Sequence, residues 1–201
     1  MLVVDASADS PFTARDRLVR VALELFATRG FQAIGLRDLA AHVGLRAGSL
    51  YHHIENKQCL LFELIESALS DLLAMTKRRM KGAKTPAERV RRFVQAFVSF
   101  TLDEKYRLIL VTREYVNLDE EQKRHADQLK RAHSALLSEI IADQYKVKGQ
   151  PCAETCLITH AVMGMLYGQV QWSEVDITQQ HLTELLTGCV LRIIASGKGS
   201  P

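Results

Sequence analysis

The side chains best suited to bind another molecule are concentrated between residues 35 and 57. A short helix is predicted over residues 46–53, and five residues fall on its outer side: Arg46, Ser49, Tyr51, His52 and His53. Guanidinium, hydroxyl and imidazole groups form hydrogen bonds with the phosphate oxygens and base edges of DNA. The pattern therefore favours a surface that binds nucleic acid.

A second helix and a tight turn must position that surface. Leu36, Leu39, Ala40 and Val43 recur at helical spacing, which predicts a helix with one apolar side. Gly44 follows, at a point where a helix commonly ends on a residue with a left-handed backbone. Two short helices around a glycine-containing turn are typical of a helix-turn-helix, whose second helix enters the major groove.

The same stretch resembles the DNA-binding domain of TetR-family transcriptional regulators. The resemblance spans residues 13–61, and these spaced positions match together: Leu25-Phe26, Gly30-Phe31, Arg37-Asp38-Leu39-Ala40, Gly44, Gly48-Ser49-Leu50-Tyr51-His52-His53 and Asn56-Lys57. It implies phosphate contacts by Tyr51, His52 and Lys57. It also implies contacts within the groove by Arg37, Ala47, Gly48, Ser49 and His53.

Gly35 and Arg46 depart from the family pattern, which usually has Ser or Thr at both positions. Glycine is a tolerable N-cap that costs only a few tenths of a kcal/mol against serine. Arg46 cannot cap the second helix of the helix-turn-helix (residues 46–53, called the reading helix below), but its guanidinium adds a candidate phosphate contact. The departures leave docking intact and base preference open, and the added charge predicts a steep salt dependence of binding.

Predicted helices account for most of the remaining chain, so the expected fold class is all-α. Thr13 with Asp16 begins one helix, Asn56 begins a long helix to about residue 81, and Thr85 begins the next. Further helices are predicted over residues 103–115, 120–146, 152–172 and 178–196, with a stop at 149–151. We expect a flexible arm (1–12), a helix-turn-helix domain (13–57) with a linking helix (57–81), an effector-binding and dimerisation domain (82–196) and a flexible tail (197–201).

The last two predicted helices are candidates for the surface through which two copies of the chain associate. The segment 152–172 is apolar on nearly all sides, so we expect it to be buried all round. One helix-turn-helix contacts too few base pairs for specificity, which favours a two-fold homodimer on a palindromic double-stranded DNA operator. In the resembled family the last two helices pair with those of a second copy as a four-helix bundle. The interface residues would be Ala161, Gly164, Met165, Gly168, Leu182, Leu186, Cys189 and Ile193.

The middle of the chain combines many large apolar side chains with few polar ones. Such a composition suits a pocket for a lipophilic small molecule as well as a plain helical core. The family pattern favours the pocket, in which an effector shifts a repressor away from its DNA-binding conformation. The run Arg113-Glu114-Tyr115 is similar to members that sense fatty acids or acyl-CoA, with Arg113 as the partner of an anionic group. The candidate effector residues are Phe97, Thr101, Leu108, Val111, Thr112, Arg113, Tyr115, His133, Met163 and Tyr167.

Four cysteines fall within apolar helical patterns and are expected to be buried thiols: Cys59, Cys152, Cys156 and Cys189. Cys152, Cys156 and His160 also recur at i, i+4 and i+8, a spacing that a metal ion can use. A metal- or redox-responsive regulator is therefore the alternative. A packing face is preferred because no fourth ligand is evident, and no metal or cofactor is expected.

An enzyme is not expected, because the sequence has no glycine-rich phosphate loop, no HExxH motif and no nucleophile elbow. The net charge of +3 is too small to argue for nucleic-acid binding by itself. No apolar run approaches membrane-spanning length and no signal peptide is recognised, which predicts a cytoplasmic protein without a membrane partner.

Overall fold

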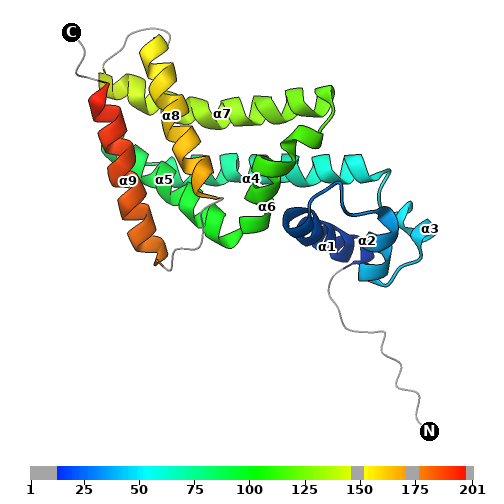
Figure 1. Ribbon diagram of the computed structural model, residues 1–201. Coiled ribbons are helices and arrows are strands. Elements are labelled where there is room, and N and C mark those ends of the chain that lie inside the picture. Colours follow the sequence, from blue (N-terminus) through cyan, green and yellow to red (C-terminus); the bar gives the residue numbers. More distant parts are fainter. Residues whose placement is uncertain (1–12, 146–151, 171–176, 198–201) are drawn as a thin grey trace.

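Three short helices form a unit at one end of the long helix that follows them (Figure 1). They are α1 (Ala14–Arg29), α2 (Leu36–Val43) and α3 (Ala47–Leu50), and α4 (Lys57–Met80) leads away from them. The computed structural model describes residues 13–145, 152–170 and 177–197. Every element within these residues is helical, so the predicted all-α fold class is confirmed.

The predicted helix starts are confirmed where side chains cap them. Thr13 Oγ1 accepts a hydrogen bond from the Asp16 N–H at 3.1 Å, and the Asp16 carboxylate accepts one from the Thr13 N–H at 2.9 Å. Thr85 Oγ1 likewise accepts from the Glu88 N–H at 3.1 Å. These bonds satisfy backbone donors that the first turn of a helix leaves without a partner.

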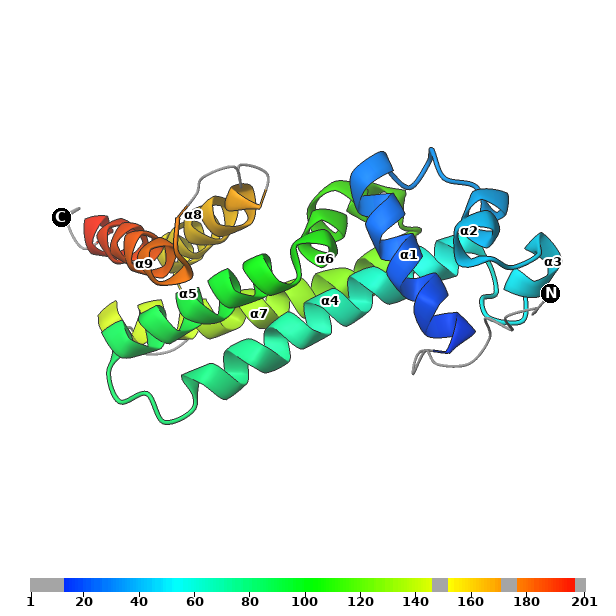
Figure 2. The same ribbon diagram turned by 90° about the horizontal axis from the view of Figure 1, so that it is seen from below.

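Three long helices run side by side and carry the core of the second domain (Figure 2). They are α4, α5 (Pro86–Asp103) and α7 (Glu120–Tyr145), and α4 packs against both of the others. Phe93, Phe97 and Phe100 of α5 are almost completely buried. Burial of such rings supplies much of the stability of a helical core, since each removes a large apolar area from water.

The segment between α5 and α7 differs from the single helix predicted to begin at Asp103. Asp103 is the last residue of α5, and Glu104 both ends that helix, through its N–H to Phe100 O, and accepts the first bond of the next. There follow α6 (Lys105–Ile109), a π-helical turn η1 (Leu110–Glu114) and a 3₁₀ turn η2 (Tyr115–Asn117). π-helical turns are rare and are often found at functional sites.

The last two helices, α8 (Ala153–Gln169) and α9 (Gln179–Ser196), run antiparallel at the end remote from α1–α3 (Figures 1 and 2). The helix predicted to reach residue 172 is described only as far as Gln169, and the predicted stop at 149–151 lies outside the described residues. The expectation that α8 is buried all round is wrong for the single chain, because Leu157 is 69% exposed. Ile158, Val162 and Leu166 already fill the core side of the helix.

The prediction of buried thiols is also wrong. Cys152, Cys156 and Cys189 are exposed and Cys59 is only partly buried. Apolar patterning placed these residues inside, but Cys156 and Cys189 are exposed residues of α8 and α9, and Cys152 is the residue that precedes α8.

Candidate nucleic-acid interface and ligand pocket

The helix-turn-helix is held together by the apolar sides of its own helices. Leu39 of α2 and Leu50 of α3 are completely buried in one cluster with Leu18 and Phe26 of α1. Gly44 joins α2 to α3 with φ +72° and ψ 26°, the left-handed backbone that glycine adopts without steric cost. The packing turns the polar side of α3 away from the protein.

The reading helix is shorter than predicted. The N–H groups of His53 and Ile54 both donate to Leu50 O, at 2.8 and 3.0 Å, and the His52 N–H donates to Ser49 O at 3.3 Å. These short-range bonds close a turn after Leu50 instead of continuing the helix to residue 53.

The side chains predicted to contact DNA lie mostly on the outside of this unit. Tyr51 is 61% exposed, which excludes a role in core packing. Arg37 and Arg46 are exposed and form no ion pair with any residue in the described part of the chain. Gly48 and His52 are also exposed, Ser49 and His53 are partly buried, and nothing is described for the side chain of Ala47.

Lys57, the third predicted phosphate ligand, faces the protein. Its Nζ lies 4.0 Å from the centroid of the Phe31 ring and 6.0 Å from that of Phe26, a cation–π arrangement. Partial burial lowers the pKa of Lys57, against the opposing effect of the Asp38 and Glu114 carboxylates. A phosphate contact by Lys57 therefore requires the side chain to turn outward.

Gly35 and Arg46, which depart from the family pattern, differ in whether a side chain caps the helix that follows. The Asp38 carboxylate accepts a hydrogen bond from the Gly35 N–H at 2.8 Å, so the start of α2 is satisfied without a hydroxyl at position 35. Arg46 makes no side-chain bond to the start of α3. Its guanidinium is thus left on the surface.

A junction joins the helix-turn-helix unit to the second domain, and it is centred on Asn117. The Asn117 Oδ1 accepts from Gln32 Nε2 at 2.8 Å, and its backbone oxygen accepts from Gln58 Nε2 at 2.5 Å. Asn117 Nδ2 donates to the carboxylate of Glu114 at 2.8 Å, and Glu114 is only 6% exposed. The segment η1–η2 is thereby tied to the loop after α1 and to the first turn of α4.

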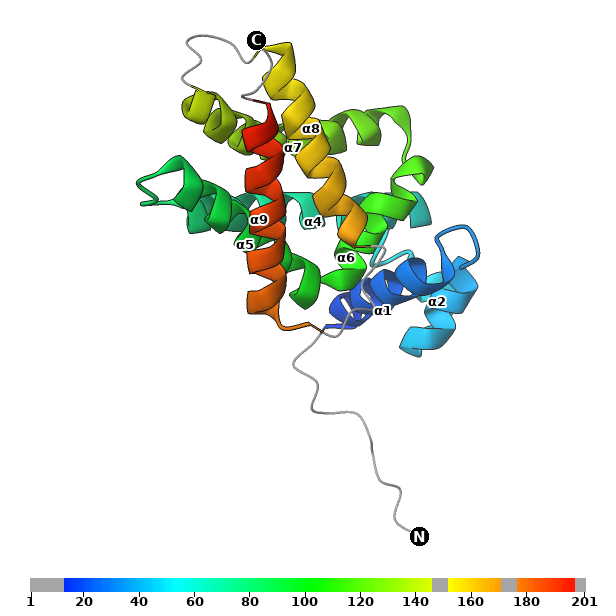
Figure 3. The same ribbon diagram turned by 60° about the vertical axis from the view of Figure 1, so that its left-hand side comes forward.

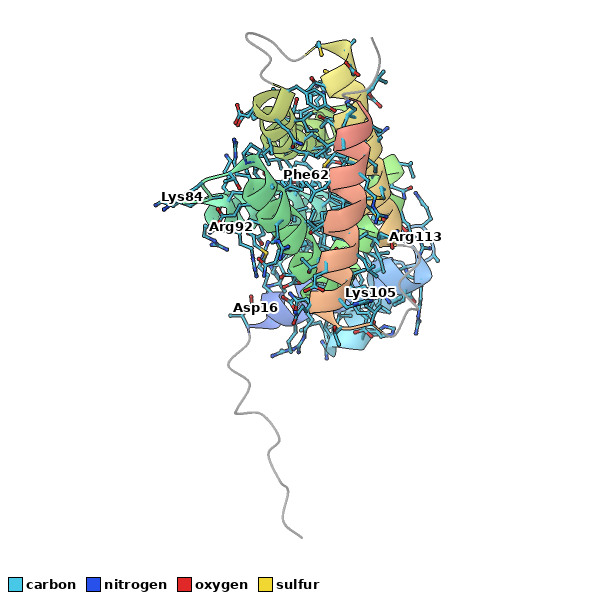
Figure 4. The ribbon with its side chains drawn as sticks, turned by 90° about the vertical axis from the view of Figure 1, so that its left-hand side faces the viewer. Asp16, Phe62, Lys84, Arg92, Lys105 and Arg113 are labelled. Atoms are coloured by element: carbon cyan, nitrogen blue, oxygen red, sulfur yellow. The ribbon has the colours of Figure 1, made fainter. Side chains whose placement is uncertain are left out.

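Arg113 belongs to this junction and does not line the pocket between η1–η2, α7 and α8, so its predicted place in that pocket is corrected. Its Nη1 donates to the backbone oxygen of Ala27 in α1 at 3.3 Å. Figure 4 shows Arg113 beside the blue ribbon of the N-terminal unit. The π-helical geometry of η1 turns Arg113 toward α1, which sequence periodicity does not anticipate.

A pocket of about 340 Å³ lies between η1–η2, α7 and α8. Five of the candidate effector residues line it: Val111, Thr112, Tyr115, Met163 and Tyr167. Lys130, Ser134 and Gly164 line it as well, although sequence reasoning had assigned the first two to no site and Gly164 to the dimer interface.

Lys130 and two tyrosines determine the polarity of this pocket. Lys130 Nζ lies 3.4 Å from the centroid of the Tyr115 ring, and burial lowers the pKa of this lysine. The Tyr115 hydroxyl donates to Asp127 Oδ1 at 2.8 Å, while burial, followed by this hydrogen bond, raises the pKa of Tyr115 to about 12. The Tyr167 hydroxyl is buried without a hydrogen-bond partner among the described residues, and burial raises its pKa, so it stays protonated.

The remaining predicted effector residues lie in the surrounding core. Phe97 packs edge-on against Tyr167, with ring centroids 5.2 Å apart, so it supports the pocket wall. Thr101 and Leu108 are buried but do not line the pocket.

His133 is a neutral core residue and does not line this pocket. Its ring stacks on Phe93 with centroids 4.8 Å apart, and its Nε2 lies 3.0 Å from Thr76 Oγ1. Because the Thr76 hydroxyl donates to Leu72 O, the histidine Nε2–H must be the donor in that contact. Burial lowers the pKa of His133 to about 4.

The outer sides of α8 and α9 form a continuous face that no other helix covers in Figure 3. Of the predicted interface residues, Ala161, Gly164 and Cys189 are exposed, and Met165, Gly168, Leu182 and Ile193 are partly buried. Leu186 is only 7% exposed because it packs in the core of its own chain, so its predicted place in an interface is corrected. Sequence reasoning missed Leu157 and Leu185, which are 69% and 51% exposed.

The described residues contain no group of three or more His, Cys, Asp or Glu side chains that could hold a metal ion. Cys152, which precedes α8, and Cys156 and His160 of α8 are all exposed and are not part of such a group. In the described part of the chain, no helix is both long and apolar enough to span a membrane.

Two family models match the chain. Residues 18–64 match the model described as bacterial regulatory proteins, tetR family, and residues 83–194 match a tetracyclin repressor-like C-terminal domain. The second match covers more than half of the 201 residues. The chain belongs to the TetR family. The resemblance inferred from residues 13–61 is therefore confirmed and extends beyond the helix-turn-helix.

Known TetR-family proteins resemble this one along different lengths. The repressor KstR2 of Mycolicibacterium smegmatis is 34% identical over 80 residues, which are 40% of this chain and 39% of KstR2. This chain spans less than half the length of the curated relatives that it matches first. PfmR of Thermus thermophilus has the same fold with a TM-score of 0.77 at 25% identity, covering 88% of this chain and 98% of PfmR. AibR, solved in complex with isovaleryl coenzyme A and operator DNA, gives a TM-score of 0.75 at 20% identity over 88% of this chain and 97% of AibR.

Proposed function

We propose that this TetR-family protein is a ligand-responsive transcriptional repressor that binds a palindromic operator as a homodimer. A small, lipophilic effector, with a fatty acid or acyl-CoA as the first candidates, would release it from DNA. The observation that carries the proposal is the segment η1–η2, because one side of it lines the pocket and the other side holds the helix-turn-helix unit.

The coupling follows from neighbouring residues of one short segment. Val111, Thr112 and Tyr115 line the pocket, whereas Arg113 and Asn117 bond to the N-terminal unit. A ligand that fits the pocket in only one arrangement of this segment favours that arrangement, and with it one placement of the reading helix. By linkage, operator DNA then weakens ligand binding by the same factor.

On DNA, Arg37, Ala47, Gly48, Ser49 and His53 would lie in the major groove, and Tyr51 and His52 would bond phosphates. Arg46 adds a phosphate contact because it is exposed and unpaired among the described residues. Lys57 joins them if its ammonium leaves the Phe31 ring. Phosphate contacts position the protein, while groove contacts read the bases.

The homodimer would form through the outer face of α8 and α9, which exposes Leu157 and Leu185 next to small residues. Gly168, which does not line the pocket, supports this assignment, because a Cβ placed there would meet nothing within 4 Å, so a partner backbone can approach closely. The two reading helices would then enter half-sites about 34–36 Å apart, or a multiple of this distance.

The known proteins support the proposal by their own properties. KstR2 is a repressor, and the AibR complex holds both operator DNA and isovaleryl coenzyme A. A bacterial DNA-binding regulator works in the cytoplasm, which we infer for this chain, and we infer no enzymatic activity.

The test is selection of DNA from a random library by the full-length protein, followed by fluorescence anisotropy on the selected site. We expect a palindrome bound by a dimer. Tyr51→Ala should weaken operator binding about tenfold, because a hydrogen bond to a charged phosphate is lost. Tyr106→Ala, which removes another exposed tyrosine from α6, should leave it unchanged. Selection of no sequence, or of an asymmetric site bound by one chain, would refute the proposal.

A further inference from the structure

The pocket beside η1–η2 presents hydrogen-bond donors whose partners are missing from the described protein. The Tyr167 side chain lines this pocket, and its hydroxyl is buried with no partner among those residues. Lys130 makes no ion pair in the described part of the chain, and its ammonium lies on the face of Tyr115. A buried donor without an acceptor costs about 1–3 kcal/mol, so the Tyr167 hydroxyl favours a ligand that supplies one. The ammonium of Lys130, which is partly buried, favours an anionic ligand.

Two further hydroxyls of the pocket, those of Thr112 and Tyr115, are already engaged, and the Ser134 hydroxyl also lines it. The Thr112 hydroxyl donates to the backbone oxygens of Leu108 and Ile109 at 3.0 and 3.1 Å. The Tyr115 hydroxyl donates to Asp127. No Asp or Glu is among the described residues that line the pocket. The lining itself therefore has no negative charge and offers a cation with a neutral donor, which is complementary to an anion. The Asp127 carboxylate lies behind the Tyr115 hydroxyl and acts on Lys130 from outside the lining.

The rest of the lining is apolar and the space is small. Val111, Met163 and the ring faces of Tyr115 and Tyr167 surround the ligand position. A volume of about 340 Å³ holds roughly ten groups of the size of a water molecule, at ~30 Å³ each. The nucleotide part of a coenzyme A thioester would have to lie outside this pocket.

We propose that the pocket binds a small monocarboxylate of about ten non-hydrogen atoms, with its carboxylate held by Lys130 Nζ and Tyr167 Oη. This inference rests on the proposed function, and it narrows the effector from lipophilic compounds in general to short amphipathic anions. Lys130 replaces Arg113 as the residue that recognises the charge. A carboxylate has two oxygens, so it can accept from both donors at once.

The same geometry explains how such a ligand reaches the reading helix. Lys130 belongs to α7 and touches the ring of Tyr115, the first residue of η2. A carboxylate that binds the ammonium competes with this ring for the cation and thus changes the contact between α7 and η2. Asn117 lies two residues further on and bonds to Gln32 in the N-terminal unit.

The experiment is isothermal titration of the full-length protein with octanoate, octanamide and octanoyl-CoA at constant ionic strength. Octanoate has about ten non-hydrogen atoms, and the amide has its shape without the charge. The variants are Lys130→Met, Lys130→Arg and Tyr167→Phe. Lys105→Met is the matched control, since it removes an exposed lysine of α6 that is labelled in Figure 4 and does not line the pocket.

We expect the unaltered protein and the Lys105→Met variant to bind octanoate about tenfold to a hundredfold more tightly than octanamide. Lys130→Met should abolish that preference, Lys130→Arg should retain most of it, and Tyr167→Phe should weaken both ligands. Equal binding of acid and amide, unchanged octanoate binding by Lys130→Met, or binding of the thioester alone would overturn the inference.

Failure of this inference is distinguishable from failure of the proposed function. A protein that selects a palindromic operator but binds no monocarboxylate refutes only the ligand class. A protein that binds octanoate as described but selects no operator refutes only the proposed repressor.

Discussion

Replacement of Asn117 by alanine tests whether the junction carries the signal from pocket to DNA. The amide of Asn117 bonds to Gln32 in the N-terminal unit and to the buried carboxylate of Glu114. Asn117→Ala removes both bonds and leaves the backbone oxygen that accepts from Gln58. The change therefore weakens the junction while the bonds from Gln58 and from Arg113 remain, and it replaces no residue of the pocket lining or the reading helix.

The magnitude follows from the exposure of the two partners. Gln32 is exposed, so water replaces its lost partner at little cost. Glu114 is 6% exposed and loses a donor to its charge, which costs about 1.5–3 kcal/mol. For a chain of this size about 2 kcal/mol lowers the melting temperature by about 4–8 °C. Because allosteric coupling is typically about 1–3 kcal/mol, loss of this contact should remove most of it.

The assay is operator affinity by fluorescence anisotropy, with and without a saturating ligand. We expect the ligand to change affinity about 5–150-fold in the unaltered protein and less than about threefold in Asn117→Ala. Val116→Ala is the control, since Val116 lies in the same turn and is 71% exposed. If Asn117→Ala melts earlier yet responds to the ligand as the control does, the junction is structural and the coupling takes another route.

Three further changes test other parts of the molecule. The pKa of a histidine is about 6.5 in the unfolded chain, whereas burial lowers that of His133 to about 4 in the folded protein, so the free energy of unfolding is highest above pH 6.5 and falls as the pH falls. Urea unfolding should show a loss on the order of 2 kcal/mol at pH 5 relative to neutral pH. His133→Leu should lack this loss. Aspartate at both Leu157 and Leu185 should convert the dimer to a monomer in light scattering, whereas an unchanged mass would place the interface elsewhere. Arg46→Ala should reduce the slope of log affinity against log salt by about one, and Arg78→Ala, at the far end of α4, should not.

Short sequence motifs correctly predicted where several helices begin and where the turn after α2 lies. Thr13, Asn56 and Thr85 each cap the helix that follows, and Gly44 adopts the expected left-handed backbone. Caps and turns depend on residues within a few positions of one another, so the sequence alone contains the information.

Long-range packing decided what the sequence did not predict. Leu185 and Leu186 are adjacent and chemically identical, yet only Leu186 is buried, because the neighbouring α5 and α8 determine which side of α9 faces inward. Lys130 lies in the polar first half of α7, a pattern typical of a solvated surface, and only the fold brings Tyr115 against it. Periodicity within a helix indicates that one side is buried but does not identify what covers it.

The π-helical turn is the point at which helical periodicity fails with functional consequence. A regular α-helix returns to the same side after about 3.6 residues, and a π-turn bonds i to i+5, so each residue within it is displaced around the axis. In η1 this displacement puts Val111 and Thr112 on the pocket while Arg113 reaches Ala27 and Glu114 is buried beside Asn117. A regular α-helix over the same residues would place these side chains at other angles around its axis. The π-helical turn η1 directs Arg113 to α1 and away from the pocket to which the family resemblance assigned it. The same turn lets one short segment contact both the ligand pocket and the N-terminal unit.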